Sequence, residues 1–450
     1  MGLKTRKLLF LFFVLAFLVI TPLVSLYAAG YKISLSGKIL QKTGMLIIDS
    51  NPDEATILID NKVQQNFLNK IRSKFSASNE KNIIKTPAKI KSLIPGEYTV
   101  KLVKDGYWSW EKKLQIYPGN STFAEDIVMF RNNLPQPIIS EEINNLKESP
   151  NKKTLAFIGS DKYYTYNTDN EEMLFYTKDK NTKNKIKWLN DEMLLFDNLL
   201  FSLHSWNKPD DLSSILKNIK NPNIQLKDPN TIYYQKNNHI IELNLKNKAI
   251  KTILQSPKIL DYLIKDNLIY TIEEINNNIF LIVYNNKNII RKINLNYDDN
   301  YVFVNAKSKL INIYNKKYDT LYLVEALNYY SPLKETMNDV LNSFWVSDNK
   351  LVYYNDYEIW IYDLVNSKKI LLTRISEKIN NVLWHPSNNY IIYSSNQSLF
   401  TIELDNRDKY STNHLIRLQN IDYLSINTKG DNLYFYAQLG KQFSLFKLAI

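Results

Sequence analysis

Apolar residues dominate the start of the chain. Residues 8–29 form a run of 22 positions without a charged side chain. A helix of this length covers about 33 Å, and the hydrocarbon core of a bilayer is about 30 Å thick. The run therefore predicts a transmembrane signal anchor at 8–29. Three basic side chains in segment 1–7 favour a cytoplasmic N-terminus, which would place the rest of the chain outside the cytoplasm.

Cleavage after the apolar run is the alternative. The small residues Ala28, Ala29 and Gly30 offer a weak signal-peptidase site. A retained anchor gives a single-pass membrane protein, whereas cleavage releases the remainder of the chain. The sequence favours the retained anchor over cleavage but does not exclude cleavage.

After a linker at 30–43, apolar and polar residues alternate with a period of two over residues 44–130. This alternation predicts several short strands joined by turns, that is, a small β-sandwich. Residues 63–85 interrupt the pattern as an insertion. The apolar spacing at 67–75 predicts a short helix within this insertion, either packed on the sheet or free to contact a partner.

A short apolar strand preceded by a polar turn then recurs at intervals of 36 to 43 residues. A period near 40 with several strands per repeat is typical of β-propeller blades. The repeats predict a seven- or eight-bladed β-propeller over 138–450, after a proline-containing linker at 131–137. The eight copies begin at Leu155, Met193, Ile232, Leu268, Leu310, Leu351, Tyr390 and Leu433.

The best pair of repeats aligns residues 344–354 with residues 383–393. Each copy has a tryptophan at the end of one strand, before a Ser/Asn-containing turn and the next apolar strand. These blade repeat aromatics are Trp188, Trp345 and Trp384. If the ring closes as propellers commonly do, a strand near Ile138 completes the last blade and removes exposed sheet edges.

Composition excludes several kinds of chemistry. The chain has no cysteine, so disulfides, thiolate zinc sites, iron–sulfur clusters and cysteine nucleophiles are absent. It has only ten glycines and no glycine-rich phosphate loop. Its four histidines, His204, His239, His385 and His414, lack metal-ligand spacing. We therefore predict no catalytic residue, no cofactor and no metal site.

Three local clusters suggest chemistry but are better explained as turns. His385 occupies a repeat turn that carries Val346 in the sister copy. The acidic pairs at 210–211 and 298–299 could contribute oxygen ligands to calcium, but neither has the spacing of a known calcium loop.

Positive charge concentrates in residues 60–113, which hold twelve lysines or arginines against five acidic residues. Close to a membrane, such a segment is attracted to anionic lipid headgroups or acidic envelope polymers. A solvated face in a lysine-rich protein explains the same count. Nucleic acid is not expected, because no nucleic-acid motif accompanies the charge.

Four ordered submotifs in residues 44–130 resemble the PEGA domain: Ser-x-Pro-x-x-Ala, Thr-Pro, Pro-Gly-x-Tyr and Gly-Tyr. They are carried by Ser50, Pro52, Ala55, Thr86, Pro87, Pro95, Gly96, Tyr98, Gly106 and Tyr107. The resemblance implies an extracytoplasmic β-sandwich of bacterial cell surfaces. The turns at 149–157 and 427–433 resemble those of TolB-like and WD-repeat-like propellers.

Together these features predict a mainly β, membrane-anchored protein of the bacterial cell envelope. It would not be an enzyme but would display its propeller to an unknown envelope protein or glycan. Two alternatives remain: an extracytoplasmic glycan-active hydrolase or lyase with its site in the propeller mouth, and a TolB-like periplasmic accessory factor.

Overall fold

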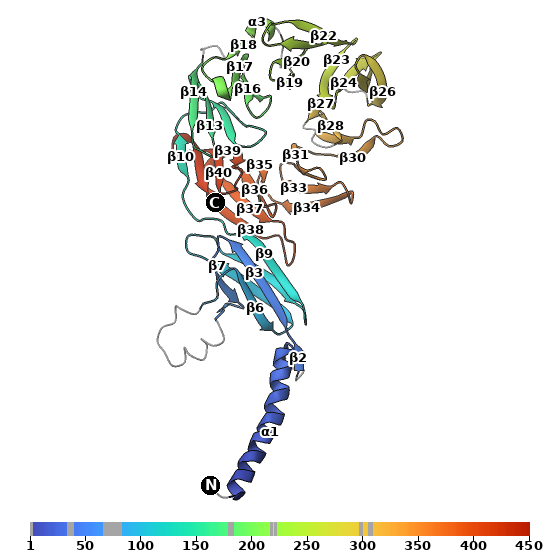
Figure 1. Cartoon of the computed structure of the whole chain (residues 1–450). Coiled ribbons are helices and arrows are strands. Elements are labelled where there is room, and N and C mark those ends of the chain that lie inside the picture. The colour runs from blue at the N-terminus through green and yellow to red at the C-terminus, as the bar shows by residue number, and fades with distance from the viewer. Residues whose placement is uncertain are drawn as a thin grey trace.

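The computed structural model describes residues 3–33, 40–65, 83–178, 184–216, 219, 223–296, 300–304 and 309–450. The helix predicted at 67–75 and the acidic pair at 298–299 lie outside the described residues. An N-terminal helix, a small sandwich and a large propeller follow one another along the molecule (Figure 1).

Helix α1 (Leu3–Ala28) matches the predicted apolar run. Within Thr5–Ala28, an 18-residue window has a mean hydropathy of 2.8, and none of that window is buried against the rest of the chain. The helix is thus long and apolar enough to cross a bilayer. The predicted linker that follows contains two short paired strands, β1 (Tyr31–Ile33) and β2 (Leu40–Lys42).

The sandwich consists of a three-stranded sheet, ordered β6-β3-β9, and a four-stranded sheet, ordered β5-β4-β7-β8. Inward positions alternate along these strands, and their apolar side chains form one shared core. The strands are β3 (Gly44–Asn51), β4 (Thr56–Ile59), β5 (Lys62–Val63), β6 (Ala88–Leu93), β7 (Gly96–Val103), β8 (Trp110–Ile116) and β9 (Ser121–Val128). A bridge between Gln65 and Ile83 joins the two ends of the insertion.

The rest of the chain is a β-propeller. Counted over the described residues from 136 onward, it contains eight four-stranded sheets, which we number as blades 1 to 8 along the chain. Each sheet contains one of the eight predicted repeats. In each blade, the predicted repeat forms the strand next to the innermost one. This strand is strongly apolar because it is buried between neighbouring blades.

Blade 1 contains β11 (Asn145–Glu148), β12 (Thr154–Ile158), β13 (Lys162–Asn167) and β14 (Met173–Thr177), and blade 2 contains β15 (Ile186–Trp188), β16 (Met193–Phe196), β17 (Leu199–Ser202) and β18 (Asp210–Asp211). Blade 3 contains β19 (Ile224–Asp228), β20 (Thr231–Lys236), β21 (His239–Asn244) and β22 (Ile250–Gln255), and blade 4 contains β23 (Ile259–Lys265), β24 (Leu268–Ile275), β25 (Asn278–Asn285) and β26 (Asn288–Leu295). Blade 2 also carries the short helices η2 (Leu203–Ser205) and α3 (Ser213–Leu216).

Blade 5 contains β27 (Tyr301–Val304), β28 (Ile311–Asn315), β29 (Thr320–Val324) and β30 (Leu333–Met337), and blade 6 contains β31 (Asn342–Ser347), β32 (Lys350–Tyr354), β33 (Glu358–Asp363) and β34 (Lys368–Arg374). Blade 7 contains β35 (Ile379–Trp384), β36 (Tyr390–Ser395), β37 (Ser398–Glu403) and β38 (Thr412–Arg417), and blade 8 contains β39 (Gln419–Ile426), β40 (Asn432–Leu439), β41 (Gln442–Ala449) and β10 (Gln136–Ile139).

Strand β10 confirms the predicted closure of the ring. It pairs antiparallel with β41 and so becomes the outermost strand of blade 8, which is otherwise built from the last strands of the chain. The first two residues of β10, Gln136 and Pro137, belong to this strand rather than to the predicted linker. The linker is therefore shorter than expected, because it must deliver the closing strand directly from the sandwich.

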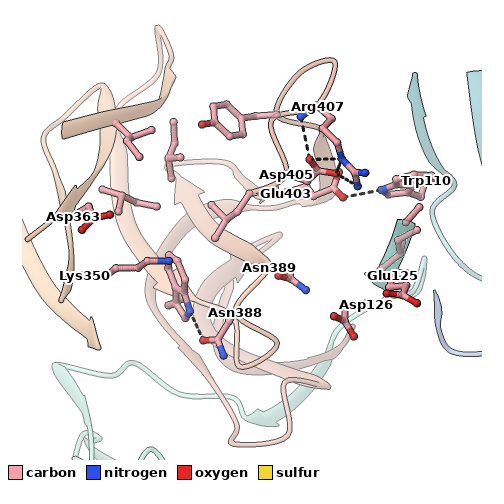
Figure 2. Close-up of a pocket in the computed structure, with 18 residues that line it drawn as sticks. Trp110, Glu125, Asp126, Lys350, Asp363, Asn388, Asn389, Glu403, Asp405 and Arg407 are labelled. Atoms are coloured by element: carbon pink, nitrogen blue, oxygen red, sulfur yellow. Dashed lines mark hydrogen bonds and ion pairs between the residues drawn. The ribbon is translucent and has the colours of Figure 1, made fainter. Parts of the chain in front are cut away.

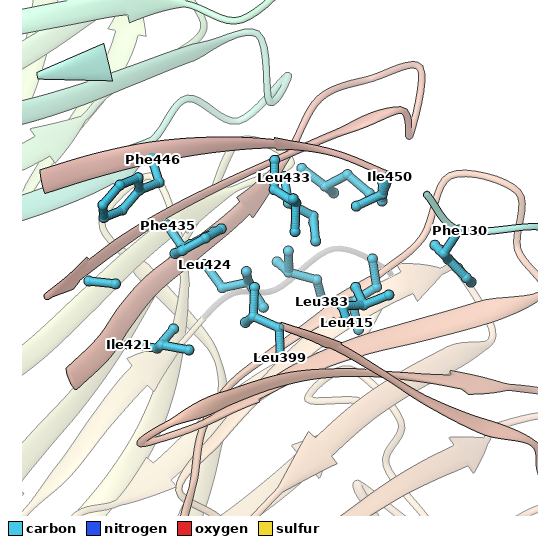
Figure 3. Packing of buried hydrophobic residues seen from close by; sticks show 14 of the residues in the cluster. Phe130, Leu383, Leu399, Leu415, Ile421, Leu424, Leu433, Phe435, Phe446 and Ile450 are labelled. Carbon is cyan, nitrogen blue, oxygen red and sulfur yellow. The ribbon is translucent and has the colours of Figure 1, made fainter. Parts of the chain in front are cut away.

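Apolar clusters join each blade to the next. The cluster between blades 7 and 8 includes Leu383, Leu399, Phe435 and Phe446 (Figure 3). Another links blade 8 to blade 1 through Tyr434 and its neighbours, and so completes the ring. Phe130, which follows the last strand of the sandwich, packs into the cluster between blades 7 and 8 and ties the two domains together.

Candidate functional site

The sandwich meets the propeller at a buried charged contact with blade 7. The side chain of Lys112 on β8 has no solvent exposure, and its Nζ lies 2.8 Å from Glu403 Oε2. The same Nζ lies 3.3 Å from Asp405 Oδ2 and donates to the Asp405 carbonyl at 2.6 Å. Trp110 Nε1 donates to Glu403 Oε1 at 3.1 Å (Figure 2). One cation and one indole thus satisfy a buried carboxylate across the two domains.

The two carboxylates of this contact respond oppositely to their surroundings. Burial raises the pKa of Glu403, although Lys112 opposes the shift. Burial also acts to raise the pKa of Asp405, but Arg407 and Lys112 hold it below its usual value. Because Asp405 keeps its charge readily, the pair of acids can balance Lys112 even where Glu403 takes up a proton.

Further hydrogen bonds extend the contact along the edge of the sandwich. Arg407 donates to both carboxylate oxygens of Asp405, at 3.0 and 2.7 Å, and to the Phe123 carbonyl at 2.7 Å. The hydroxyl of Tyr390 in blade 7 accepts from Val128 N at 3.2 Å. These contacts come from β9 of the three-stranded sheet, and those of Trp110 and Lys112 come from β8 of the four-stranded sheet. Contacts from both sheets thus fix the orientation of the sandwich on the propeller.

A cavity of 490 Å³ opens beside the charged contact. Its described lining carries more acidic than basic side chains and includes Trp384 and Tyr410. Asp363 and Lys350 lie together on one side of it, and Glu125, Asp126 and Arg407 lie on the other (Figure 2). Such a lining suits hydrogen bonding to a polar ligand, but it brings together no nucleophile and base.

Sequence reasoning missed this junction, although one signal of it exists. The inward-facing residues of β8 are Trp110, Lys112, Leu114 and Ile116. Lys112 therefore occupies a buried position in a strand whose other inward-facing side chains are apolar. A lysine in a buried position requires a carboxylate partner. Its partners lie about 290 residues further along the chain, and no local pattern identifies them.

The PEGA-like motif residues take structural positions in the sandwich. Thr86 Oγ1 lies 2.6 Å from Ser50 Oγ and accepts from Ala55 N at 3.0 Å, which joins two of the motif segments in a buried cluster. Tyr98 OH donates to the Ile94 carbonyl at 2.7 Å and closes the turn before β7. The other motif residues lie beside these: Pro52 and Pro87 follow Ser50 and Thr86, Pro95 precedes β7 and Gly96 begins it, and Gly106 and Tyr107 form the turn after it.

Replacing Thr86 with valine is expected to lower the free energy of unfolding of the sandwich by about 1–3 kcal/mol, because the buried Ala55 N–H loses its acceptor. Hydrogen exchange of the β3 and β6 amides in the full chain measures the effect. Thr122→Val is the matched control, since its hydroxyl donates to the Gln115 carbonyl at the exposed surface. Equal exchange rates in the two variants would contradict the prediction.

His385 has the turn role that the repeats predict. Its backbone N–H donates to the carbonyl five residues ahead, as those of Ser149 and Asn427 do in other blades. Its Nδ1 accepts from Ser387 N at 3.1 Å, and its Nε2 donates to the Gly430 carbonyl at 2.9 Å. Both ring nitrogens are thereby committed to the turns of blades 7 and 8. A cavity of 760 Å³ lies beside this turn, between the sandwich and the propeller.

The hydrogen bonds of His385 require a neutral ring, and burial lowers its pKa. Because the unfolded state then binds the proton more tightly, we expect stability to be full above about pH 6.5 and to fall as the pH drops below it. His385→Asn, which installs the side chain found at Asn427, should flatten this dependence. His414→Asn removes an exposed histidine and should leave the pH dependence of stability unchanged. Urea titrations at pH 5 and 7.5 measure the stability of each variant.

The three repeat aromatics lie at blade junctions. Trp345 and Trp384 are buried and belong to the clusters on either side of blade 6, while Trp188 is half-buried between blades 1 and 2. Trp188 Nε1 donates to the Lys147 carbonyl of blade 1 at 3.1 Å. Trp384 Nε1 donates to Asn388 Oδ1 within its own turn. They pack as core residues and do not form an exposed stacking platform.

The innermost strands of blades 6, 7, 8 and 1 border a cavity of 320 Å³. Among the described residues that line it, Glu148 is the single carboxylate; Ser425 donates to it at 2.6 Å, and burial raises its pKa. The indole N–H of Trp345 also borders this cavity and has no hydrogen-bond partner among the described residues. The geometry offers donors and acceptors to a ligand, but no converging pair of acids.

No group of three or more potential metal ligands occurs among the described residues. Asp210 and Asp211 are exposed, and Lys248 lies 3.2 Å from Asp210. Four of the eight described lysines of the basic segment 60–113 make contacts within the protein: Lys101 and Lys113 pair with acids, Lys104 donates to a carbonyl, and Lys112 is buried.

Exposed apolar side chains gather on the outer rim of blades 4 and 5. The loop after β29 is held by Asn328, whose side chain accepts from two backbone N–H groups. Tyr330 in this loop is fully exposed, and Tyr329 stacks with Arg291 of blade 4. The rim patch consists of Ile289, Ile290, Leu327, Tyr329, Tyr330 and Leu333. Exposed aromatic and apolar side chains of this kind are common in protein interfaces.

Comparison with known protein families matches part of the sandwich. Residues 78–127 match the PEGA domain family, a segment that excludes the first motif at Ser50. No curated protein matches the chain in sequence. The family matched by the sandwich is the one expected from its motifs. Solved structures that are similar to the chain include a WD40 domain and a propeller.

Three of these structures illustrate the likeness. The C-terminal WD40 domain of Sif2 is 14% identical with a TM-score of 0.48, over 71% of this chain and 99% of that domain. The Dos1 propeller is 12% identical with a TM-score of 0.44, over 71% and 95%. Hsv2 of Kluyveromyces lactis is 12% identical with a TM-score of 0.43, over 62% and 99%.

Proposed function

We propose that the protein is a membrane-anchored scaffold of the cell envelope, in which the PEGA-like sandwich holds the propeller at a fixed orientation outside the cytoplasm. The observation that carries the proposal is the buried contact of Lys112 and Trp110 with Glu403. A loose tether would need no such contact. A stalk that presents a binding surface gains from it, because a fixed orientation reduces the entropy lost when a partner binds.

Several features support binding rather than catalysis. The rim patch supplies exposed aromatic side chains on a loop whose backbone donates two hydrogen bonds to Asn328. The cavity at the ring centre has a single carboxylate in its described lining, whereas glycoside hydrolysis generally uses two. The propeller therefore offers a rigid surface to an envelope protein or glycan, and the apolar helix keeps that surface close to the membrane.

Fractionation of the tagged full-length protein tests this proposal. The chain should remain in the membrane after carbonate extraction and be digested by protease added to intact cells or spheroplasts. Release in soluble form after trimming near Gly30 would favour a periplasmic accessory factor. Protection from external protease would overturn the topology, and glycan cleavage by the purified protein would favour the enzymatic alternative.

A further inference from the structure

The end of the sandwich nearest helix α1 is joined to that helix by hydrogen bonds. Thr43 N and Oγ1 both donate to the Gly30 carbonyl, at 2.8 and 2.7 Å. Gly119 N, in the turn between β8 and β9, donates to the Thr43 carbonyl at 2.9 Å. Gly30 lies only two residues beyond the last residue of α1. The β8–β9 turn therefore sits immediately beside the end of the helix (Figure 1).

Close packing fixes this arrangement. A Cβ at Gly44 would lie 2.5 Å from the Tyr117 carbonyl oxygen, so only glycine lets the chain pass the turn. A Cβ at Gly119 would lie 2.8 Å from the end of the Lys42 side chain, which places that ammonium group over the turn. The turn, the β1–β2 hairpin and the end of α1 thus form one small structural unit.

The side chains of this unit have the chemistry of a membrane–water interface. Tyr117, which begins the turn, is 56% exposed, and Tyr27 is 66% exposed in the last turn of α1. Tyr31, partly buried, and the exposed Lys32 and Lys42 follow on the hairpin. Tyrosines are enriched where hydrocarbon gives way to headgroups, and lysines there reach toward phosphate. All of these residues lie outside the basic segment 60–113.

We infer that the β8–β9 turn and the β1–β2 hairpin form a lipid-contacting collar in which Tyr117 enters the headgroup region and Lys32 and Lys42 bind lipid phosphates. The inference rests on the proposed function, since it requires α1 to span the bilayer. Two contacts with the membrane, the helix and the turn, fix the tilt of the sandwich. Through the contact of Lys112 with Glu403, they also fix the tilt of the propeller.

The absence of cysteine makes a direct test simple, because one introduced cysteine is the only labelling site. We would attach a nitroxide to Leu15→Cys, Tyr117→Cys and Tyr330→Cys variants of the full-length protein in nanodiscs of phosphatidylcholine with some phosphatidylglycerol. Collision rates with oxygen, which concentrates in lipid, and with a water-soluble nickel chelate report the depth of each label. Pro118→Cys provides a second label in the turn in case Tyr117→Cys folds poorly.

The label at Leu15 should collide mainly with oxygen, and the label at Tyr330 mainly with the nickel chelate. The label in the turn should collide with the nickel chelate about threefold less often than the label at Tyr330, as expected for a headgroup position. A turn label as accessible to nickel as Tyr330, with Leu15 still in lipid, would overturn the collar but leave the anchor intact. A water-exposed label at Leu15 would overturn the anchor and the collar together.

Discussion

Replacing Lys112 with methionine is expected to destabilise the junction between sandwich and propeller by about 3–5 kcal/mol, because the Glu403 carboxylate stays buried without its cation. Methionine keeps most of the side-chain volume, so the loss reports on charge rather than packing. Limited proteolysis of the segment that joins the sandwich to the propeller should become faster. Hydrogen exchange of the β8 and β37 amides should become faster as well.

Matched variants separate the buried charge from a general effect of losing a lysine. Lys113→Met removes the neighbouring, exposed lysine, whose Nζ lies 3.7 Å from Glu97, and should change stability by less than about 1 kcal/mol. Adding Glu403→Gln to Lys112→Met should recover much of the loss. In Lys112→Met alone, acidification should restore stability, because burial raises the pKa of Glu403 and the folded state holds its proton more tightly. Equal stability of the two single lysine variants would refute the role of Lys112.

The second large effect is expected where the ring closes. Ile138 and Ile139 in β10 are half-buried and pack on the cluster between blades 8 and 1. Changing both to serine removes apolar contacts worth about 2–4 kcal/mol and weakens the strand that pairs with the outer edge of β41. We expect faster hydrogen exchange in both blades 1 and 8, and aggregation through the exposed strand edge.

The control for this variant uses the same chemical change on another outermost strand. Ile289 and Ile290 are consecutive isoleucines in β26 of blade 4, and both are more exposed. Changing them to serine should affect stability by less than about 1 kcal/mol and should leave blades 1 and 8 unaltered. If the two double variants behave alike, β10 has no special role in closing the ring.

The architecture was predictable because each of its parts has a local signature. The apolar run gives α1, alternation gives the sandwich strands, and the 40-residue period gives the blades, since the strand in each repeat is buried on both faces. The closing strand was also predictable, because a ring whose last blade lacks one strand must take it from the other end of the domain.

The candidate site was not predictable in the same way. Lys112 is conspicuous on β8, but Glu403 and Asp405 look like ordinary polar residues at the end of a blade strand. Their pairing depends on where the sandwich rests on the ring, and no periodicity encodes that position. The rim patch was not predicted from the sequence for a similar reason. In sequence, Tyr329 and Tyr330 resemble core aromatics, and only their place in a loop distinguishes them.

The pairing of β10 with β41 sets an order on biosynthesis. The two strands are separated by about 310 residues, and β41 is made after every other strand of the described ring. Blades 1 to 7 can therefore form during synthesis while the ring stays open, and β10 must wait with an unsatisfied edge. A chain secreted in an extended form would meet this requirement on the far side of the membrane, where a chaperone that shields β10 would have the greatest effect on yield.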